Sequence, residues 1–241
     1  FEKAGIIKTG VPCITGVDSP GALQVIRKVC KSKSAPLLRT RSVRFRVRDS
    51  SLNGFITDVF FKGTKYADLK ISLCGAYQLW NAAAALLTLR ELSDGTFSIP
   101  ETAVRRGLSQ IQKFSGISSR LSVFSRRPFI LTDVAHNPAA MKALVRSLID
   151  LGVKKAVLVF GIMKDKDHRK MIRVIIPAVS RVVGVTPSTD RARSSLELVK
   201  QFEDKGINVL NGGTVAAGVR KALRLADRER PVLITGSHFV V

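Results

Sequence analysis

The sequence has few cysteines and no long apolar run. Its 241 residues include three cysteines, Cys13, Cys30 and Cys74, whose spacing suggests no pairing. Unpaired cysteines are typical of proteins in a reducing compartment, where thiols stay free. No apolar stretch approaches the ~20 residues that a membrane-spanning helix needs. We therefore expect a cytoplasmic protein with no membrane partner.

Acidic residues are also scarce. The chain has 18 Asp and Glu and 40 Lys and Arg, which give a net charge of +22. Such a charge attracts anionic partners. The densest basic segment, residues 39–48 (RTRSVRFRVR), alternates as a half-exposed strand does, and a solvated face is its default interpretation. A groove for a polyanionic substrate is the minority interpretation. With two Tyr and one Trp available for stacking, nucleic acid is the less favoured partner.

The pattern of apolar runs changes at a Gly/Ser-rich break at residues 113–120 (KFSGISSR). Beyond it, short and continuously apolar strands alternate with helices, as in a buried parallel sheet. We predict an α/β protein with a domain over residues 1–114, a linker over 115–120 and a doubly wound domain over 121–241. In such a sheet, ligands bind beyond the carboxyl ends of the strands.

One strand end carries a concentration of polar groups. The segment TDVAHNP places Asp133, His136, Asn137 and Pro138 between an apolar strand and a helix. Asn137 can cap the helix and Pro138 suits its first turn, so we predict a capping role for Asn137. Asp133 is either a turn residue or a functional carboxylate, and His136 either a surface imidazole or a functional one. We expect this loop to lie outside the core.

Seven segments in order resemble the folylpolyglutamate synthase/dihydrofolate synthase family of the Mur ligase superfamily. They are EKAGIIKTGVPCITG, GAYQLWNAAAAL, SSRL, TDVAHNPAA, VFGIMKDKD, TPSTDRARS and ITGSHFVV, the last of which matches a Gly-Ser-Leu-Tyr strand of the family. The resemblance spans essentially the whole chain. It implies the end of a Mur-ligase-type central ATPase domain followed by a Rossmann-like C-terminal domain.

The resemblance also implies an activity, in which ATP and Mg²⁺ drive the joining of L-glutamate to folate or dihydropteroate through an acyl phosphate. Such chemistry needs a phosphate loop of the form G-x-x-x-x-G-K-[ST], and the sequence lacks one. The stretch NGGTVAAG has the wrong spacing and is interpreted as a turn into a helix. We therefore expect a monomeric piece of a longer ligase, inactive by itself.

The family's site residues match five positions of this sequence. By resemblance, Lys3 is the lysine that is carbamylated and then binds Mg²⁺, Asn81 lies near the adenine, and Arg120 contacts the ATP phosphates. Asp133 and His136 position nucleotide and substrate. Each also has a plain alternative: a surface lysine for Lys3, a polar residue in an alanine-rich helix for Asn81, and a solvated linker residue for Arg120.

Other positions match less specifically or depart from the family. Lys166, Asp167, Arg191 and Ser237 fall in matching segments without an individual assignment. Tyr77 replaces a histidine of the family and Val134 replaces a glycine. Two alternatives stay open at this point, a peptidoglycan Mur ligase and a noncatalytic basic α/β module that binds nucleic acid.

Overall fold

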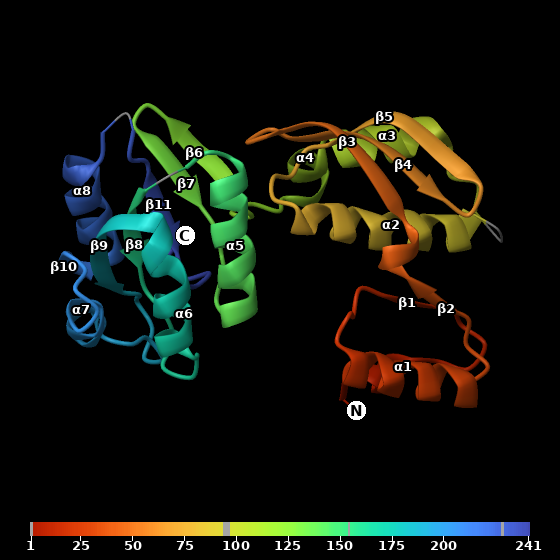
Figure 1. The fold of residues 1–241 in the computed structure, drawn as a ribbon, viewed down its shortest axis with the longest axis horizontal. Helices are drawn as coiled ribbons and strands as arrows, with labels where there is room; N and C mark the ends of the chain where they lie inside the picture. The colour runs from red at the N-terminus through yellow and green to blue at the C-terminus, as the bar shows by residue number, and fades with distance from the viewer. Residues whose placement is uncertain (1, 94–96, 154, 228) are drawn as a thin grey trace. The chain divides into compact units, whose positions relative to one another are not determined.

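The computed structural model describes residues 2–93, 97–153, 155–227 and 229–241, and the chain divides into two compact units (Figure 1). The first contains the described residues up to Ser50, Gly54–Ser72 and those from Ala76 to Ser115. The second contains Ser51–Asn53, Leu73–Gly75 and the described residues from Gly116 onward. The main division therefore falls within the Gly/Ser-rich break on which the predicted domain boundary was based.

The first unit begins with a small layer of helix on strand. It consists of η1 (Glu2–Ile6), β1 (Cys13–Thr15), α1 (Pro20–Ser32) and β2 (Leu37–Arg39), with β1 and β2 paired in parallel. A proline at the first position starts α1, where its missing N–H costs nothing. Ala4, Ile7 and Cys30 are buried together and join η1 to α1.

The rest of the first unit is an antiparallel sheet covered on one face by helices. After η2 (Thr40–Ser42) come β3 (Arg44–Ser51), β4 (Gly54–Phe61) and β5 (Thr64–Ile71), in that order in the sheet. The helices are α2 (Tyr77–Ser93), α3 (Glu101–Ser109) and α4 (Ile111–Ser115). Phe45 of β3 packs edge-on against Trp80 of α2, so the alternate arginines of β3 lie on the other face and are exposed.

The second unit is built on a six-stranded, mostly parallel sheet. Its strands are β6 (Ser122–Arg126), β7 (Phe129–Thr132), β8 (Ala156–Phe160), β9 (Val179–Thr186), β10 (Val209–Thr214) and β11 (Val232–Thr235). They lie in the order β10-β9-β8-β11-β7-β6, and only β6 runs antiparallel to its neighbour. The α/β prediction is confirmed. Strand β6, a short and partly polar edge strand, was not predicted.

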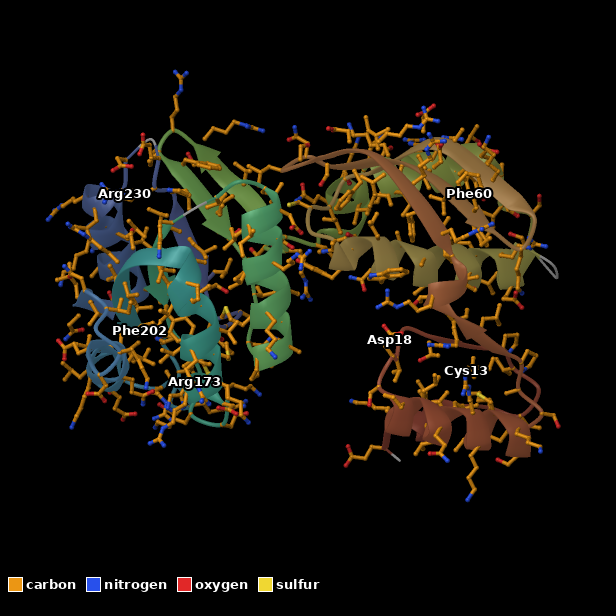
Figure 2. All side chains as sticks on the ribbon, viewed as in Figure 1. Cys13, Asp18, Phe60, Arg173, Phe202 and Arg230 are labelled. Carbon is orange, nitrogen blue, oxygen red and sulfur yellow. The ribbon has the colours of Figure 1, made fainter. Side chains whose placement is uncertain are left out.

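Helices cover both faces of this sheet. Successive side chains of a strand point to opposite faces, so a strand that is apolar throughout must be covered on both sides. One core includes Leu158 and Leu233 with residues of α5 (Pro138–Asp150), α6 (His168–Ile175) and α7 (Ser195–Glu203). The other includes Val157 and Val159 with α8 (Val215–Leu225). A short η3 (Ile176–Ala178) follows α6. Phe202 of α7 (labelled in Figure 2) meets Phe160 of β8 edge to face, with 5.8 Å between ring centroids.

Within the described ranges, no helix is both long and apolar enough to cross a membrane.

Candidate functional site

The carboxyl ends of three adjacent parallel strands bring the candidate residues of the second unit together. Strand β11 lies between β7 and β8 and pairs in parallel with both. The segments that follow these three strands carry the chain's three histidines: His136 after β7, His168 at the start of α6 after β8, and His238 after β11. This edge is where ligands bind in open parallel sheets.

Asp133, the first residue after β7, uses both carboxylate oxygens to hold backbone groups. Its Oδ2 accepts a hydrogen bond from the N–H of Leu121 at 2.8 Å. Its Oδ1 accepts from the N–H of Ala135 at 2.7 Å. The side chain therefore orders two segments, the one just after Arg120 and the turn that leads to His136.

The expectation that this loop lies outside the core is wrong. Asp133 is 5% exposed, and Val134 and Ala135 are buried as well. Leu131 and Ala135 belong to the same core cluster, so the packed layer continues past the end of β7. The side chain that Val134 adds in place of the family's glycine is enclosed in the protein.

Arg120 is presented by a backbone that is fixed on both sides. Ser119 and Leu121 adopt positive φ angles of 58° and 48°, an uncommon conformation for residues with a side chain. The N–H of Val134 donates to the carbonyl of Ser119 at 3.0 Å, which holds this bend to the strand end. The Arg120 side chain itself is exposed, and no hydrogen bond or ion pair ties it to another described residue.

His136 and Asn137 have clear local roles. The Asn137 side chain accepts a hydrogen bond from the N–H of Ala140 at 2.9 Å and Pro138 opens α5, so the predicted cap is confirmed. His136 is half-buried, with Nδ1 3.0 Å from the carbonyl oxygen of Val134. Its ring centroid lies 5.8 Å from that of His238.

Sequence reasoning missed His238. It is exposed on the turn that follows β11, directly after Ser237. The available signal was that histidine is rare in this chain and that both His136 and His238 follow apolar strands. The missing information was strand order, because only the position of β11 beside β7 makes the two loops neighbours.

The loops after β8 and β9 hold the less specific matches. Asp167 caps α6 by accepting from the N–H of Lys170 at 3.1 Å, and its carboxylate also pairs with the Lys170 ammonium at 2.9 Å. These contacts lower the pKa of Asp167. Lys166 and Arg191 both reach the carboxylate of Asp165, at 2.8 and 3.5 Å. Lys166 and Asp167 therefore have partners close to them in sequence, and Arg191 reaches across from the loop after β9 to the loop after β8.

Ser237 is buried and forms part of a tight turn. Its Oγ accepts a hydrogen bond from the N–H of Phe239 at 3.2 Å, and its carbonyl accepts from the N–H of Val240 at 3.2 Å. Gly236 before it has a φ of 115°. A Cβ at Gly236 would come within 2.3 Å of the carbonyl oxygen of Gly161, so only glycine fits here.

The other two candidate residues, Lys3 and Asn81, lie in the first unit. Lys3 is exposed on η1 and lines a pocket of about 480 Å³ together with Glu2, Val17 and Ile26. Asn81 is exposed on α2, and its Nδ2 donates to Oε1 of the buried Gln78 at 2.8 Å. Both side chains are accessible to a ligand.

The exposed side chains of Arg120 and Asn81 are each accessible to a ligand, whereas the described residues form no magnesium site. No group of three His, Cys, Asp or Glu residues in the described ranges is arranged to hold a metal. Both carboxylate oxygens of Asp133, at the strand end, already accept hydrogen bonds from backbone N–H groups. These residues therefore do not build a magnesium site by themselves, and Lys3 as a carbamate would supply one ligand only.

Comparison with known proteins identifies the second unit first. The Mur ligase glutamate ligase domain matches residues 119–238. A folylpolyglutamate synthase from Lacticaseibacillus casei is 30% identical over 247 residues, which cover 99% of this chain and 54% of that protein. The chain thus spans about half the length of the curated relative that it matches.

Solved structures agree with this similarity. The folylpolyglutamate synthase from Thermotoga maritima is 27% identical with a TM-score of 0.78, over 100% of this chain and 54% of that one. A bifunctional folylpolyglutamate synthase/dihydrofolate synthase solved with Mn, AMPPNP and L-glutamate bound is 25% identical with a TM-score of 0.78, over 99% of this chain and 53% of that one. The chain therefore belongs to the folylpolyglutamate synthase/dihydrofolate synthase family of the Mur ligase superfamily.

Proposed function

We propose that this chain is part of an ATP-dependent ligase that joins L-glutamate to a folate, or to dihydropteroate. The observation that carries the proposal is the strand-end arrangement in which buried Asp133 orders the backbone around Arg120 and leaves the Arg120 guanidinium free. A relative with AMPPNP and L-glutamate bound supports the assignment of nucleotide and amino acid as ligands.

The reaction has two steps. The substrate carboxylate attacks the γ-phosphorus of ATP, which forms an acyl phosphate and releases ADP. The amine of glutamate then attacks the acyl carbon, and the amide forms as inorganic phosphate leaves and the amine loses a proton. Mg²⁺ would neutralise charge on the transferring phosphoryl group, but the described residues do not build its site by themselves.

Arg120 is the residue of this chain that we assign to the phosphoryl group. A guanidinium presents a planar fork of donors that matches phosphate oxygens, and it keeps its charge at any physiological pH. Donors that are already oriented stabilise the charge that develops in the transition state without further reorganisation. Asp133 is then a positioning residue, because it acts on the backbone next to Arg120 and not on the substrate.

The remaining assignments concern binding. We assign His136 to contact the nucleotide or substrate at the carboxyl end of β7, and Asn81 to contact the adenine. Lys3, as a carbamate, would bring a negative charge toward the metal. Formation of the carbamate requires the neutral amine, which reacts with CO₂ and loses a proton.

The test uses the full-length ligase of which we propose this chain to be a part. It should release phosphate only when ATP, L-glutamate and a reduced folate or dihydropteroate are all present, with a product one glutamate heavier by mass spectrometry. The 241-residue chain alone should not turn over. Phosphate release that does not depend on glutamate would contradict the proposal.

Substitution of Arg120 tests the role of the free guanidinium. Arg120→Ala should lower kcat/KM by about 2 to 4 kcal/mol, the usual effect of removing one preorganised donor. Arg120→Lys should recover part of the loss, since charge remains and the fork does not. Arg146→Ala is the matched control, because Arg146 is an exposed arginine of the same unit that pairs with Asp150 on its own helix. Equal activity of the Arg120 and Arg146 variants would contradict the assignment.

A further inference from the structure

His136 has a ring nitrogen that is prepared to donate a lone pair. Its Nδ1 lies 3.0 Å from the carbonyl oxygen of Val134, which can only accept a hydrogen bond. The hydrogen of the neutral ring therefore sits on Nδ1, and Nε2 carries the lone pair. Histidines that bind a metal through one ring nitrogen usually donate the N–H of the other nitrogen to a backbone carbonyl or a carboxylate.

His238 is held in place by its backbone while its side chain is exposed. The backbone of this turn passes close to Gly161, because a Cβ at Gly236 would lie 2.3 Å from the Gly161 carbonyl oxygen. Ser237 accepts hydrogen bonds from the N–H groups of Phe239 and Val240, and Val240 is buried. The imidazole is thus attached to a rigid turn at the end of β11.

The two imidazoles have the spacing expected around one ion. Their centroids are 5.8 Å apart and their planes are inclined by 43°. Zinc binds imidazole nitrogen at about 2.0–2.1 Å, so the centres of two rings on one ion lie roughly 5 to 6 Å apart. No hydrogen bond joins the two rings, so neither imidazole uses the other as its partner.

We propose that His136 and His238 form a binding site for a divalent transition metal ion of the zinc class. Imidazole suits Zn²⁺, Ni²⁺ and Cu²⁺, whereas Mg²⁺ requires oxygen ligands and would not bind. Because the described residues provide no third His, Cys, Asp or Glu for the site, water completes the coordination. Binding of a zinc-class ion by these two imidazoles does not require that the chain act as a ligase.

His168 offers a matched control on the same edge of the sheet. Its Nδ1 also faces a carbonyl, that of Lys166, at 3.3 Å. Burial, together with nearby Arg193 and Arg169, lowers the pKa of His168. It has no imidazole neighbour among the described residues, since the ring pair involves only His136 and His238. His168 therefore also follows the carboxyl end of a strand of this sheet, but it lacks the second ligand.

The experiment titrates the 241-residue chain with Zn²⁺ by calorimetry in a buffer that does not bind metal. Wild type should bind one ion saturably, and millimolar Mg²⁺ should not displace it. His238→Leu, which introduces the family's residue at an exposed position, and His136→Gln should each weaken binding by at least tenfold. His168→Gln should bind as wild type does.

A second measurement identifies the ligands directly, even if a variant is poorly folded. In wild type, substoichiometric Cu²⁺ should broaden the imidazole NMR signals of His136 and His238 and leave those of His168 sharp. Unchanged Zn²⁺ affinity in His238→Leu, or broadening of all three histidines alike, would overturn the proposal. So would displacement of Zn²⁺ by Mg²⁺, because it would mean that oxygen atoms hold the ion.

Discussion

The backbone N–H of Leu121 donates a hydrogen bond of 2.8 Å to Oδ2 of Asp133, and this contact joins the start of the second unit to the end of its first parallel strand. The same carboxylate accepts from the N–H of Ala135. A buried carboxylate that serves two backbone donors has a structural role whatever else it does. It also explains how Arg120, next to Leu121, acquires a fixed backbone while its side chain stays free.

Replacement of Asp133 should therefore destabilise the protein. Asp133→Ala leaves the N–H groups of Leu121 and Ala135 without their acceptor, so we expect a loss of about 2 to 4 kcal/mol in the free energy of unfolding. Urea denaturation measures it. Asp150→Ala, which removes an exposed carboxylate paired with Arg146, should cost less than about 0.5 kcal/mol. If Asp133→Ala keeps wild-type stability but loses turnover, the carboxylate acts on the substrate and not on the backbone.

The turn before His238 should tolerate no side chain at Gly236. In Gly236→Ala the new Cβ would lie 2.3 Å from the carbonyl oxygen of Gly161, at a φ of 115°. We expect a loss of about 3 to 5 kcal/mol from the steric clash and the backbone strain together.

Gly152→Ala separates these two effects. Gly152 has a φ of 74°, but a Cβ there meets nothing within 4 Å. Only backbone strain remains, and about 1 kcal/mol should be lost. Thermal unfolding of both variants gives the comparison, and equal losses would show that the contact with Gly161 does not matter.

Cys74 should make stability depend on alkaline pH. Burial, and then the charge of Asp133, raise the pKa of the Cys74 thiol from 9.0 to about 12. Above pH 9 the unfolded chain ionises this thiol while the folded chain keeps it protonated, so the unfolded state gains stability. The contribution is complete below pH 9 and is lost between pH 9 and pH 12.

The measurement is the difference in unfolding free energy between wild type and Cys74→Ala at several pH values. Wild type should lose stability relative to the variant as the pH rises from 8 to 11, since alanine cannot ionise. A difference that stays constant over this range would mean that the thiol ionises alike in both states. Lysine and tyrosine titration affects both proteins equally and cancels.

The second unit should fold by itself, though less stably than within the chain. We expect residues 116–241 to unfold cooperatively, because their sheet and both flanking cores are complete. Leu52 and Cys74, which pack against this core, are absent from that piece. Its melting temperature should therefore be lower than that of the same unit in the whole chain, and a broad melt would contradict the prediction. Calorimetry of both proteins makes the comparison.

Local sequence was enough for features that depend on neighbouring residues. The Asn137 cap follows from an asparagine before a proline and an apolar helix, and the structure confirms it. NGGTVAAG was predicted as a turn into a helix. The helix is confirmed, since Thr214 caps α8, but residues 211–214 end strand β10 and do not form a turn. The alternation of apolar strands and helices was likewise sufficient for the α/β class and, with the seven motifs, for the family.

Tertiary structure decided what depends on strand order. The last strand, β11, inserts between β7 and β8, and this insertion places His238 beside His136 although the two are far apart in the chain. The contact between Leu121 and Asp133 also depends on strand order. The Leu121 N–H lies beside the Asp133 carboxylate because β6, which follows Leu121, pairs antiparallel with β7, which precedes Asp133. Local propensity acts over a few residues, whereas strand order is set by how the whole apolar surface is buried, and a single sequence contains no local signal for that.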